Sequence, residues 1–256
     1  MTLIKQVSKL FKIVVLSVFC VLTCFSLTAF ADSGLVTIKN TIRAALASSR
    51  PDLNIVSIKQ SQIEGVYTVS IGEGPTLYFS ENGKNFILGD LFRVKKNELV
   101  NLDDIRRNNK RSEQINTIDT EDMIIFMATG KRQAVVNIFT DVDCFYCQKL
   151  HLEVPMLNQM GIEVRYLAYP RAGIDSGSYN KIATAWCSKD PKDAITRLKK
   201  KEVLAENVCL PNPVEEHFIL GQRIGVRGTP AMVLESGEMV PGYMSARELG
   251  RRMGIK

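Results

Sequence analysis

The chain has 256 residues, of which 45% are hydrophobic and 23% are charged, and its 33 lysines and arginines face 27 aspartates and glutamates. This composition is ordinary for a globular protein of one large or two modest domains. The net charge of +6 falls to about +3 without residues 1–31, because that segment holds three lysines and no acid. This balance argues against a nucleic-acid-binding protein, whose basic residues would be in excess and clustered.

The N-terminal segment is typical of a secretory signal peptide. Lysines precede an apolar run over residues 13–28, and Ala29-Phe30-Ala31 supplies the small residues that a signal peptidase reads. The apolar run is shorter than the roughly 20 residues of a membrane-spanning helix. We therefore expect an exported chain that begins at Asp32. The alternatives are an uncleaved anchor and a lipoprotein attached through Cys24, although Val21-Leu22-Thr23 lacks the small residues that lipoprotein processing requires.

A small α+β domain is predicted next, over residues 32–96. Apolar residues at near-helical spacing predict a helix from Leu35 to about Ser48, which Arg50-Pro51 ends. Four β-type segments follow, at residues 54–59, 65–71, 76–79 and 85–93. Between the last two, Asn82-Gly83 predicts a hairpin turn in which both residues have positive φ. Such a domain buries little core, so we expect its edge strands to pair with a second copy in a homodimer.

Residues 97–117 are expected to form a helical linker. From Asn97 to about Asn116 the chain is polar and charged with a thin apolar stripe, which predicts one amphipathic helix about 30 Å long. A charged helix of this kind is typical of a spacer between two domains. The sequence leaves open the alternative that it packs along the second domain.

Residues 118–256 alternate between strands and helices. Two buried strands are predicted, at residues 134–140 and 162–169. The helix between them is expected to run from Cys147 to about Met160, with a kink at Pro155. This βαβ order implies a parallel pair of strands. The rest of the domain is predicted as a mostly helical stretch over about 178–225, a hairpin over 231–242 and a last helix capped by Ser245 and Glu248.

Four cysteines remain beyond the leader, and in an exported chain they are expected to form disulfides. Three pairings are possible. The C-x-x-C spacing lets Cys144 pair with Cys147, which leaves Cys187 with Cys209 in a structural bridge that contributes roughly 3 kcal/mol. Zinc is the rival for the C-x-x-C pair, but its further ligands would have to be His151 and the distant Cys187 and Cys209. We therefore expect no metal, and no other cofactor.

The stretch FTDVDCFYCQKLH, residues 139–151, carries the candidate chemistry. Cys144 is expected in the first turn of a helix, where free backbone N–H groups and the helix dipole favour a thiolate. The pKa of a cysteine can fall there from about 8.5 to between about 3.5 and 7.5, so Cys144 is the candidate nucleophile. Cys147, one turn further on, should be buried and less ionised, as suits a resolving thiol. An inert crosslink is the alternative, although it would close almost no loop.

Residues beside Cys144 are expected to tune its chemistry. Asp141 and Asp143 bring negative charge close to the sulfur and should raise its pKa. The intervening Phe145 and Tyr146 include no cation, so we expect a weaker oxidant than a histidine-bearing motif would give. Their rings are candidate substrate contacts, with local packing as the alternative for Phe145.

Gly228-Thr229-Pro230 lies just before the predicted strand at residue 231. A proline at the first position of a strand removes no ladder bond, and the X-Pro bond is the one in which a cis peptide costs least. An ordinary trans turn is the default for an isolated Thr-Pro. A cis bond would instead expose the Thr229 backbone beside the sulfurs, where it could bind an extended substrate. By helical spacing, His151 is assigned to a polar face without a catalytic role, and Lys199-Lys200-Lys201 to a solvated helix face.

The stretches FTDVDCFYCQKLHLEVPMLNQMGIEVRYLAYPRAG and GTPAMVLESGEMVPGY resemble the DsbC/DsbG family of periplasmic thiol:disulfide interchange proteins, most closely the DsbC isomerases. The resemblance implies a cystatin-like N-terminal dimerisation domain, a helical linker and an α/β thioredoxin-fold domain with a helical insertion, in a V-shaped homodimer around an uncharged cleft. It implies Cys144 as the attacking thiol, Cys147 as its partner and Thr229 beside a cis Pro230. It further implies the Cys187–Cys209 bridge and a membrane reductase of the DsbD type that keeps Cys144 reduced.

One position departs from the family pattern: glycine is usual where Phe145 stands, and DsbG has proline there. The redox potential and the substrate preference are therefore open. The predicted function is a periplasmic isomerase or reductase of incorrect disulfides in exported proteins. The alternatives are a DsbG-like reductase of sulfenylated cysteines, a DsbA-type oxidase, which would lack the N-terminal domain, and a holdase chaperone that binds unfolded chains.

Overall fold

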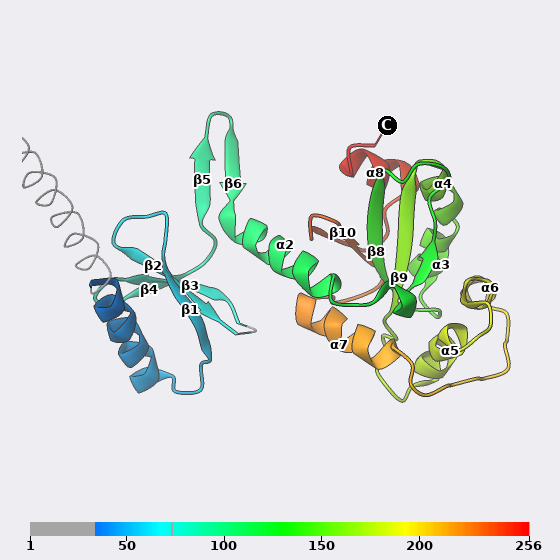
Figure 1. The fold of residues 1–256 in the computed structure, drawn as a ribbon, viewed down its shortest axis with the longest axis horizontal. Helices are drawn as coiled ribbons and strands as arrows, with labels where there is room; N and C mark the ends of the chain where they lie inside the picture. Colours follow the sequence, from blue (N-terminus) through cyan, green and yellow to red (C-terminus); the bar gives the residue numbers. More distant parts are fainter. Residues whose placement is uncertain (1–33, 73, 256) are drawn as a thin grey trace, which may run out of the picture. The chain divides into compact units, whose positions relative to one another are not determined.

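The computed structural model describes residues 34–72 and 74–255 of the chain. The expected signal peptide, residues 1–31, lies outside these residues. The chain divides into two compact units between Leu91 and Phe92, and Figure 1 draws both. The predicted domain limits, 32–96, 97–117 and 118–256, stay predictions. No helix in the described part of the chain is both long and apolar enough to cross a lipid bilayer.

The N-terminal unit is one helix, over residues 34–49, and one antiparallel sheet (Figure 1). The sheet has the order β1-β2-β3-β4, formed by Ile55–Gln60, Val66–Ile71, Thr76–Ser80 and Phe86–Leu88. Ile42 and Leu46 of the helix pack with Val69 and Phe79 of the sheet in one buried cluster. The helix ends just before Pro51, as its sequence predicts.

The turn between β3 and β4 differs from the predicted one in its conformation. Of the pair Asn82-Gly83, only the glycine has a positive φ, of 69°. Asn82 instead accepts hydrogen bonds through its side chain, from Lys84 N at 3.0 Å and Ser80 Oγ at 2.8 Å. An asparagine that binds the backbone two residues on closes a turn without the left-handed conformation.

The predicted helix over 97–116 begins later than expected. Strand β5 (Phe92–Lys95) pairs with β6 (Glu98–Asn101), and helix α2 covers only Leu102–Ile115. Asn101 caps the helix, because its side chain accepts hydrogen bonds from the backbone N–H groups of Asp103 and Asp104. The helical prediction was therefore wrong for residues 97–101, which form a turn and a strand.

Helix α2 belongs to the second unit and packs along the rest of it, as the alternative interpretation of its sequence allowed. Arg111 donates hydrogen bonds from Nε to Ile224 O at 3.1 Å and from Nη1 to Gly237 O at 2.8 Å. Ser112 Oγ donates to Glu235 O at 2.9 Å. The C-terminal half of α2 is therefore fixed to helix α7 (Val214–Ile224) and to a β hairpin turn.

The second unit is built on a mixed sheet of order β11-β10-β8-β9-β7 (Figure 1). Its strands are β7 (Ile124–Phe126), β8 (Ala134–Thr140), β9 (Ile162–Ala168), β10 (Ala231–Leu234) and β11 (Met239–Pro241). The predicted pair β8 and β9 is parallel, and the other pairs are antiparallel. Residues 118–256 therefore form the α/β sheet domain that their alternating pattern predicts.

Alternate residues of these strands belong to two different buried clusters, which therefore lie on opposite faces of the sheet. One cluster joins Val136 and Ile138 of β8 to side chains of helices α3 to α6 and α8; the other joins Phe139 to α2 and α7. The helices are α3 (Phe145–His151), α4 (Val154–Gln159), α5 (Gly177–Trp186), α6 (Pro191–Lys199) and α8 (Ala246–Arg252).

Two helix predictions need correction. The single helix expected to end at about Met160 is divided into α3 and α4, because Pro155 cannot continue the helical hydrogen bonds and instead stands in the first turn of α4. Most residues between 200 and 213, predicted within a helical stretch, are not helical. The capping box of Ser245 and Glu248 at α8 is confirmed.

The turn between β10 and β11 should be intolerant of a side chain at Gly237. This residue has a φ of 78°, and a Cβ there would overlap the carbonyl oxygen of Asn108 in α2. Gly130 has a similar φ of 74° with open space around it, so Gly130→Ala is the matched control. We expect Gly130→Ala to lower the free energy of unfolding by about 1 kcal/mol and Gly237→Ala by about 2–5 kcal/mol.

Urea denaturation followed by fluorescence measures this difference, because the sole tryptophan, Trp186, lies in the second unit and donates a hydrogen bond to Asp122 O at 2.7 Å. Equal losses in the two variants would contradict the packing of α2 on the turn.

Candidate active site

The C-x-x-C pair lies where β8 passes into α3. Cys144 is the N-cap of α3, with an extended backbone (φ −83°, ψ 117°), and its sulfur accepts a hydrogen bond from Cys147 N at 3.4 Å. Cys147 follows one turn on, inside the helix. Both cysteines are free thiols in this structure. A sulfur at this position can accept hydrogen bonds from the otherwise unpaired N–H groups of the first turn, which stabilise its negative charge.

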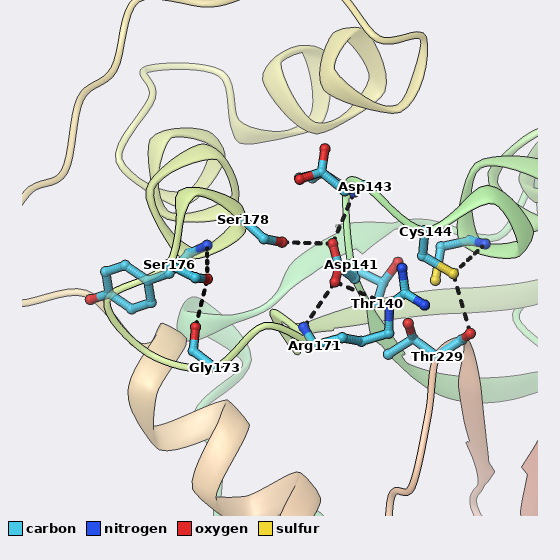
Figure 2. A network of polar contacts seen from close by, with 12 residues as sticks. Thr140, Asp141, Asp143, Cys144, Arg171, Gly173, Ser176, Ser178 and Thr229 are labelled. Carbon is cyan, nitrogen blue, oxygen red and sulfur yellow. Dashed lines mark hydrogen bonds and ion pairs between the residues drawn. The ribbon is translucent and has the colours of Figure 1, made fainter.

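The segment before β10 lies against the same sulfur. Cys144 Sγ is 3.2 Å from the carbonyl oxygen of Thr229, and the Thr229–Pro230 peptide bond is cis (Figure 2). The structure therefore brings together Cys144, Cys147, Thr229 and Pro230, which are separated by more than 80 residues in the sequence.

The two thiols differ in their protonation. The pKa of Cys144 is lowered to about 5, chiefly by a hydrogen bond from the Cys147 thiol, while burial acts in the opposite direction. The positive charge of Arg171 lowers it further. Burial raises the pKa of Cys147, and its hydrogen bond to Cys144 raises it again. Near neutral pH, Cys144 is the thiolate and Cys147 the protonated thiol.

The expected increase of the Cys144 pKa by neighbouring carboxylates is wrong, because both carboxylates are engaged elsewhere. Asp141 is 2% exposed and accepts hydrogen bonds from Ser178 Oγ at 2.8 Å and from Arg171 N at 2.8 Å. Asp143 forms an ion pair with Lys181 at 3.0 Å. Figure 2 shows the Asp141 carboxylate between these partners, beside the turn that carries Cys144.

Cys147 is buried, as its place inside the helix predicted, and Cys144 is buried as well. Cys144 is 2% exposed and Cys147 is 1% exposed, whereas Phe145 and Tyr146 between them are 67% and 54% exposed. The Thr229 carbonyl and the first turn of α3 enclose the Cys144 sulfur, which an open helix N-terminus would leave free. The exposed surface between the two cysteines is therefore aromatic, while the sulfurs are buried.

A third aromatic residue, missed in the sequence, extends this surface. The ring of Tyr146 stacks on Tyr243 at 6.4 Å between centroids, and Phe145 meets Tyr146 edge to face at 5.4 Å. Lys149 Nζ lies 4.2 Å from the centre of the Tyr243 ring. No spacing rule connects residue 243 to the C-x-x-C pair; only the tertiary fold does.

Two basic side chains assigned to solvated faces are buried. His151 is 8% exposed, and its ring lies between Tyr166 Oη at 2.9 Å and Thr196 Oγ1 at 3.1 Å. Lys199 is 4% exposed at the end of α6, and Nζ donates a hydrogen bond to Asp141 O at 3.0 Å. The sequence did contain a signal for this burial, because Lys199 follows Ile195 by four residues and shares its helix face.

Cys187 and Cys209 form a disulfide bond, with an S–S distance of 2.06 Å and 5.6 Å between their Cα atoms. Joined in this way, they are not available as metal ligands beside Cys144 and Cys147. Within residues 34–72 and 74–255, no group of three or more histidine, cysteine or acidic side chains is arranged to hold a metal ion.

Comparison with known proteins assigns both parts of the chain. Residues 29–104 match the disulfide bond isomerase protein N-terminal domain, and residues 120–254 match the thioredoxin-like domain. The chain is 34% identical over 233 residues to the thiol:disulfide interchange protein DsbC of Escherichia coli K12, covering 90% of this chain and 91% of that protein. This chain belongs to the DsbC family. DsbC of Haemophilus influenzae is 35% identical over 212 residues, which cover 82% and 89% of the two chains.

A solved disulfide interchange protein from Neisseria gonorrhoeae is 26% identical and covers 54% of this chain and 100% of its own, with a TM-score of 0.47. Membership in the DsbC family, with its thioredoxin-like domain, makes the chain a thiol:disulfide interchange enzyme. The fold expected from the sequence, an N-terminal α+β domain followed by a thioredoxin-like domain, is confirmed.

The low pKa of Cys144 predicts how the reduced protein responds to pH. The ultraviolet absorbance of the thiolate should persist at neutral pH and disappear as the pH falls through about 5. Because a free thiol titrates near about 8.5, the ionised sulfur stabilises the reduced protein fully above about pH 8.5, and this stabilisation is lost as the pH falls through the folded pKa. A Cys144→Ser variant should lack the transition, and a midpoint near that of free cysteine would contradict the geometry described here.

Proposed function

We propose that the protein is a periplasmic disulfide isomerase and reductase in which Cys144 is the catalytic nucleophile and Cys147 the resolving thiol. The proposal rests above all on one observation: the Cys144 sulfur sits at the N-cap of α3 with a pKa of about 5, next to a protonated Cys147. A thiolate, and not a thiol, attacks a disulfide, so the two cysteines are prepared for different steps.

The reaction proceeds by two exchanges. The Cys144 thiolate attacks one sulfur of an incorrect substrate disulfide; a mixed disulfide forms, and the other substrate sulfur leaves as a thiolate. This released thiolate can attack a different substrate disulfide, which reshuffles the pairing and eventually frees Cys144. Alternatively, Cys147 loses its proton and attacks the Cys144 sulfur, which releases the substrate reduced and leaves the enzyme with a Cys144–Cys147 disulfide.

Substrate is proposed to bind across the Thr229 backbone and the exposed aromatic rings. The Thr229 carbonyl lies 3.2 Å from the reactive sulfur, so an extended chain that pairs with this segment, at Thr229 and Pro230, would present its disulfide to Cys144. Phe145 and Tyr146 are more than half exposed, which suits contact with apolar side chains of unfolded proteins. The Cys187–Cys209 disulfide is assigned a structural role, closing the end of α5 onto the segment that leads to α7.

The protein is proposed to act as a homodimer through its N-terminal unit. Strand β4 is an edge of the sheet, and all three of its residues, Phe86, Ile87 and Leu88, are more than half exposed. An apolar edge strand left open would aggregate, so pairing with a second copy gives it a partner. Two catalytic units in one dimer would raise the local concentration of thiolate around a bound substrate.

The periplasm is the proposed location, supported by the leader pattern before Asp32 and by a disulfide, which an oxidising compartment maintains. A membrane reductase of the DsbD type is the proposed electron donor, since an isomerase needs a reduced Cys144. The proposed substrates are misfolded exported proteins.

None of the rival functions is favoured by a particular contact. The relatives named above are DsbC proteins, and the match of residues 29–104 to the isomerase N-terminal domain argues against a DsbA-type oxidase. The DsbG-like reductase of sulfenylated cysteines and the holdase stay predictions, and assays on sulfenylated thiols and on aggregating proteins would separate them from the isomerase.

Replacement of Cys144 tests the catalytic assignment. We expect Cys144→Ser to reduce reactivation of scrambled ribonuclease to the uncatalysed rate, because the hydroxyl is not ionised and cannot exchange with a disulfide. Cys147→Ser should still attack but should accumulate mixed disulfides, visible as bands that a reductant removes. Full reactivation by Cys144→Ser would refute the assignment.

A charge on β4 tests the dimer. Ile87→Glu would bury two unpaired carboxylates in a symmetric interface, and we expect the dissociation constant to rise at least about hundredfold. Val56→Glu is the matched control, because Val56 lies on the other edge strand, β1, and is 63% exposed compared with 69% for Ile87. Sedimentation velocity gives the oligomeric state of each variant; a dimer that persists in Ile87→Glu would place the interface elsewhere.

A further inference from the structure

Lys199 is a buried lysine directly beneath the active-site turn. It is 4% exposed, whereas Lys200 and Lys201, which follow it, are exposed. Its Nζ donates hydrogen bonds to Thr140 Oγ1 and to Asp141 O, at the end of β8. The ammonium therefore lies where the sheet passes into the loop that carries the cysteines.

Lys199 forms no salt bridge among the residues that the structure describes. The carboxylate of Asp141, just beyond β8, is held by other groups. Asp141 uses its carboxylate for Arg171 and Ser178, and offers Lys199 only its backbone carbonyl. Burying a charge without an opposite charge is costly, so such a lysine is rare as a purely structural element. A buried ionisable group beside a reactive pair is instead characteristic of a group that tunes the reaction.

The same carbonyl oxygen connects Lys199 to the cysteines. Asp141 O accepts a hydrogen bond from Cys144 N at 3.4 Å as well as the one from Lys199 Nζ at 3.0 Å. Lys199 attracts the Cys147 thiolate, which lowers the pKa of Cys147 against the larger, opposite effect of burial. The attraction acts in both directions. Burial lowers the pKa of Lys199, and a Cys147 thiolate raises it by favouring the charged form of the lysine.

We propose that Lys199 is a positioning residue for the resolving step: its ammonium stabilises the thiolate of Cys147 while that sulfur attacks the mixed disulfide. The inference rests on the proposed function and adds to it a residue that controls the rate at which Cys147 resolves the mixed disulfide. Cys147 gives up its proton, its sulfur bonds to Cys144 Sγ, and the bond from Cys144 to the substrate breaks. The electron pair of that bond leaves with the substrate sulfur, which takes up a proton.

Lys199 is the charged group that acts on Cys147, because the other titratable groups around that sulfur are neutral or paired. Tyr166 of β9 faces the pair with a pKa raised by burial, so it is neutral. His151, one turn along α3, has its pKa lowered to about 4, first by burial and then by Lys199, so it too is neutral near pH 7. Cys144 is bonded to substrate when Cys147 acts and carries no charge then. The Asp141 carboxylate is paired with Arg171, and its charge favours the charged form of Lys199.

The consequence is a division between two fates of the mixed disulfide. Rapid resolution by Cys147 releases a reduced substrate, whereas slow resolution leaves time for the substrate to reshuffle its own disulfides. By favouring the Cys147 thiolate, Lys199 moves the enzyme toward reduction. A variant without this charge should isomerise for longer on each encounter and reduce less.

Lys199→Gln is the decisive variant, because glutamine can keep donors for Thr140 and Asp141 without the charge. Each unit by which the pKa of Cys147 rises leaves about tenfold less thiolate, and the greater nucleophilicity of a more basic thiolate returns about threefold. We therefore expect the mixed disulfide with a cysteine-containing model peptide to resolve at least about threefold more slowly at neutral pH, with a pH profile displaced upward by at least about one unit. Lys199→Met, which removes the donors as well, should show the same displacement.

Controls separate this effect from damage to the fold. Lys200→Met removes an exposed charge from the neighbouring position and should resolve at the wild-type rate. Attack by Cys144 is measured separately, as mixed-disulfide formation in a Cys147→Ser background, and the Lys199 variants should change it by less than about twofold, because Cys144 is ionised by other contacts.

Resolution at the wild-type rate and pH in both Lys199 variants would overturn the proposal, as would equal slowing of attack and resolution, which indicates a structural role. If Cys147→Ser forms no mixed disulfide at all, the proposed function fails instead, so the two failures are distinguishable.

Discussion

Asp141 holds the turn on which the active site depends. Its buried carboxylate binds Ser178 of α5 and Arg171 beyond β9, and its carbonyl oxygen accepts hydrogen bonds from Cys144 N and Lys199 Nζ. One residue thus ties the end of β8 to the helical insertion, to the neighbouring strand and to the first turn of α3 (Figure 2). A buried carboxylate that lost these partners would be left unsatisfied at a high cost in free energy, so the hydrogen bonds of Asp141 stabilise the turn.

This arrangement gives two chemically identical side chains opposite properties. Cys144 occupies a helix N-cap, where the backbone N–H and the thiol of Cys147 donate to its sulfur. Cys147 is inside the helix, where burial disfavours its thiolate more than its neighbours favour it. The hydrogen bond between them acts in both directions, lowering the pKa of one cysteine and raising that of the other. The positions of the two cysteines in one helical turn therefore decide which sulfur attacks first, and this difference exists already in the free protein.

The features that a local rule governs were predictable from the sequence. The C-x-x-C pair at a helix start and the capping box at Ser245 each depend on residues within a few positions. The parallel pairing of β8 and β9 follows from the strand–helix–strand order. Burial of Lys199 and His151 was not predicted, because polar residues were assigned to solvent although each has hydrogen-bond partners that only the fold supplies. Tyr243 was missed for the same reason, since its contact with Tyr146 joins residues about a hundred positions apart.

Phe145 illustrates how a substitution can change function without affecting the fold. It is 67% exposed in the first turn of α3, and its ring touches that of Tyr146 at the surface. An exposed side chain there contributes little to stability, because little apolar area leaves water. Through its contact with Tyr146, the phenyl ring belongs to an exposed aromatic surface that reaches Tyr243. A different side chain at this position would therefore change the surface beside the C-x-x-C pair while leaving the buried core as it is.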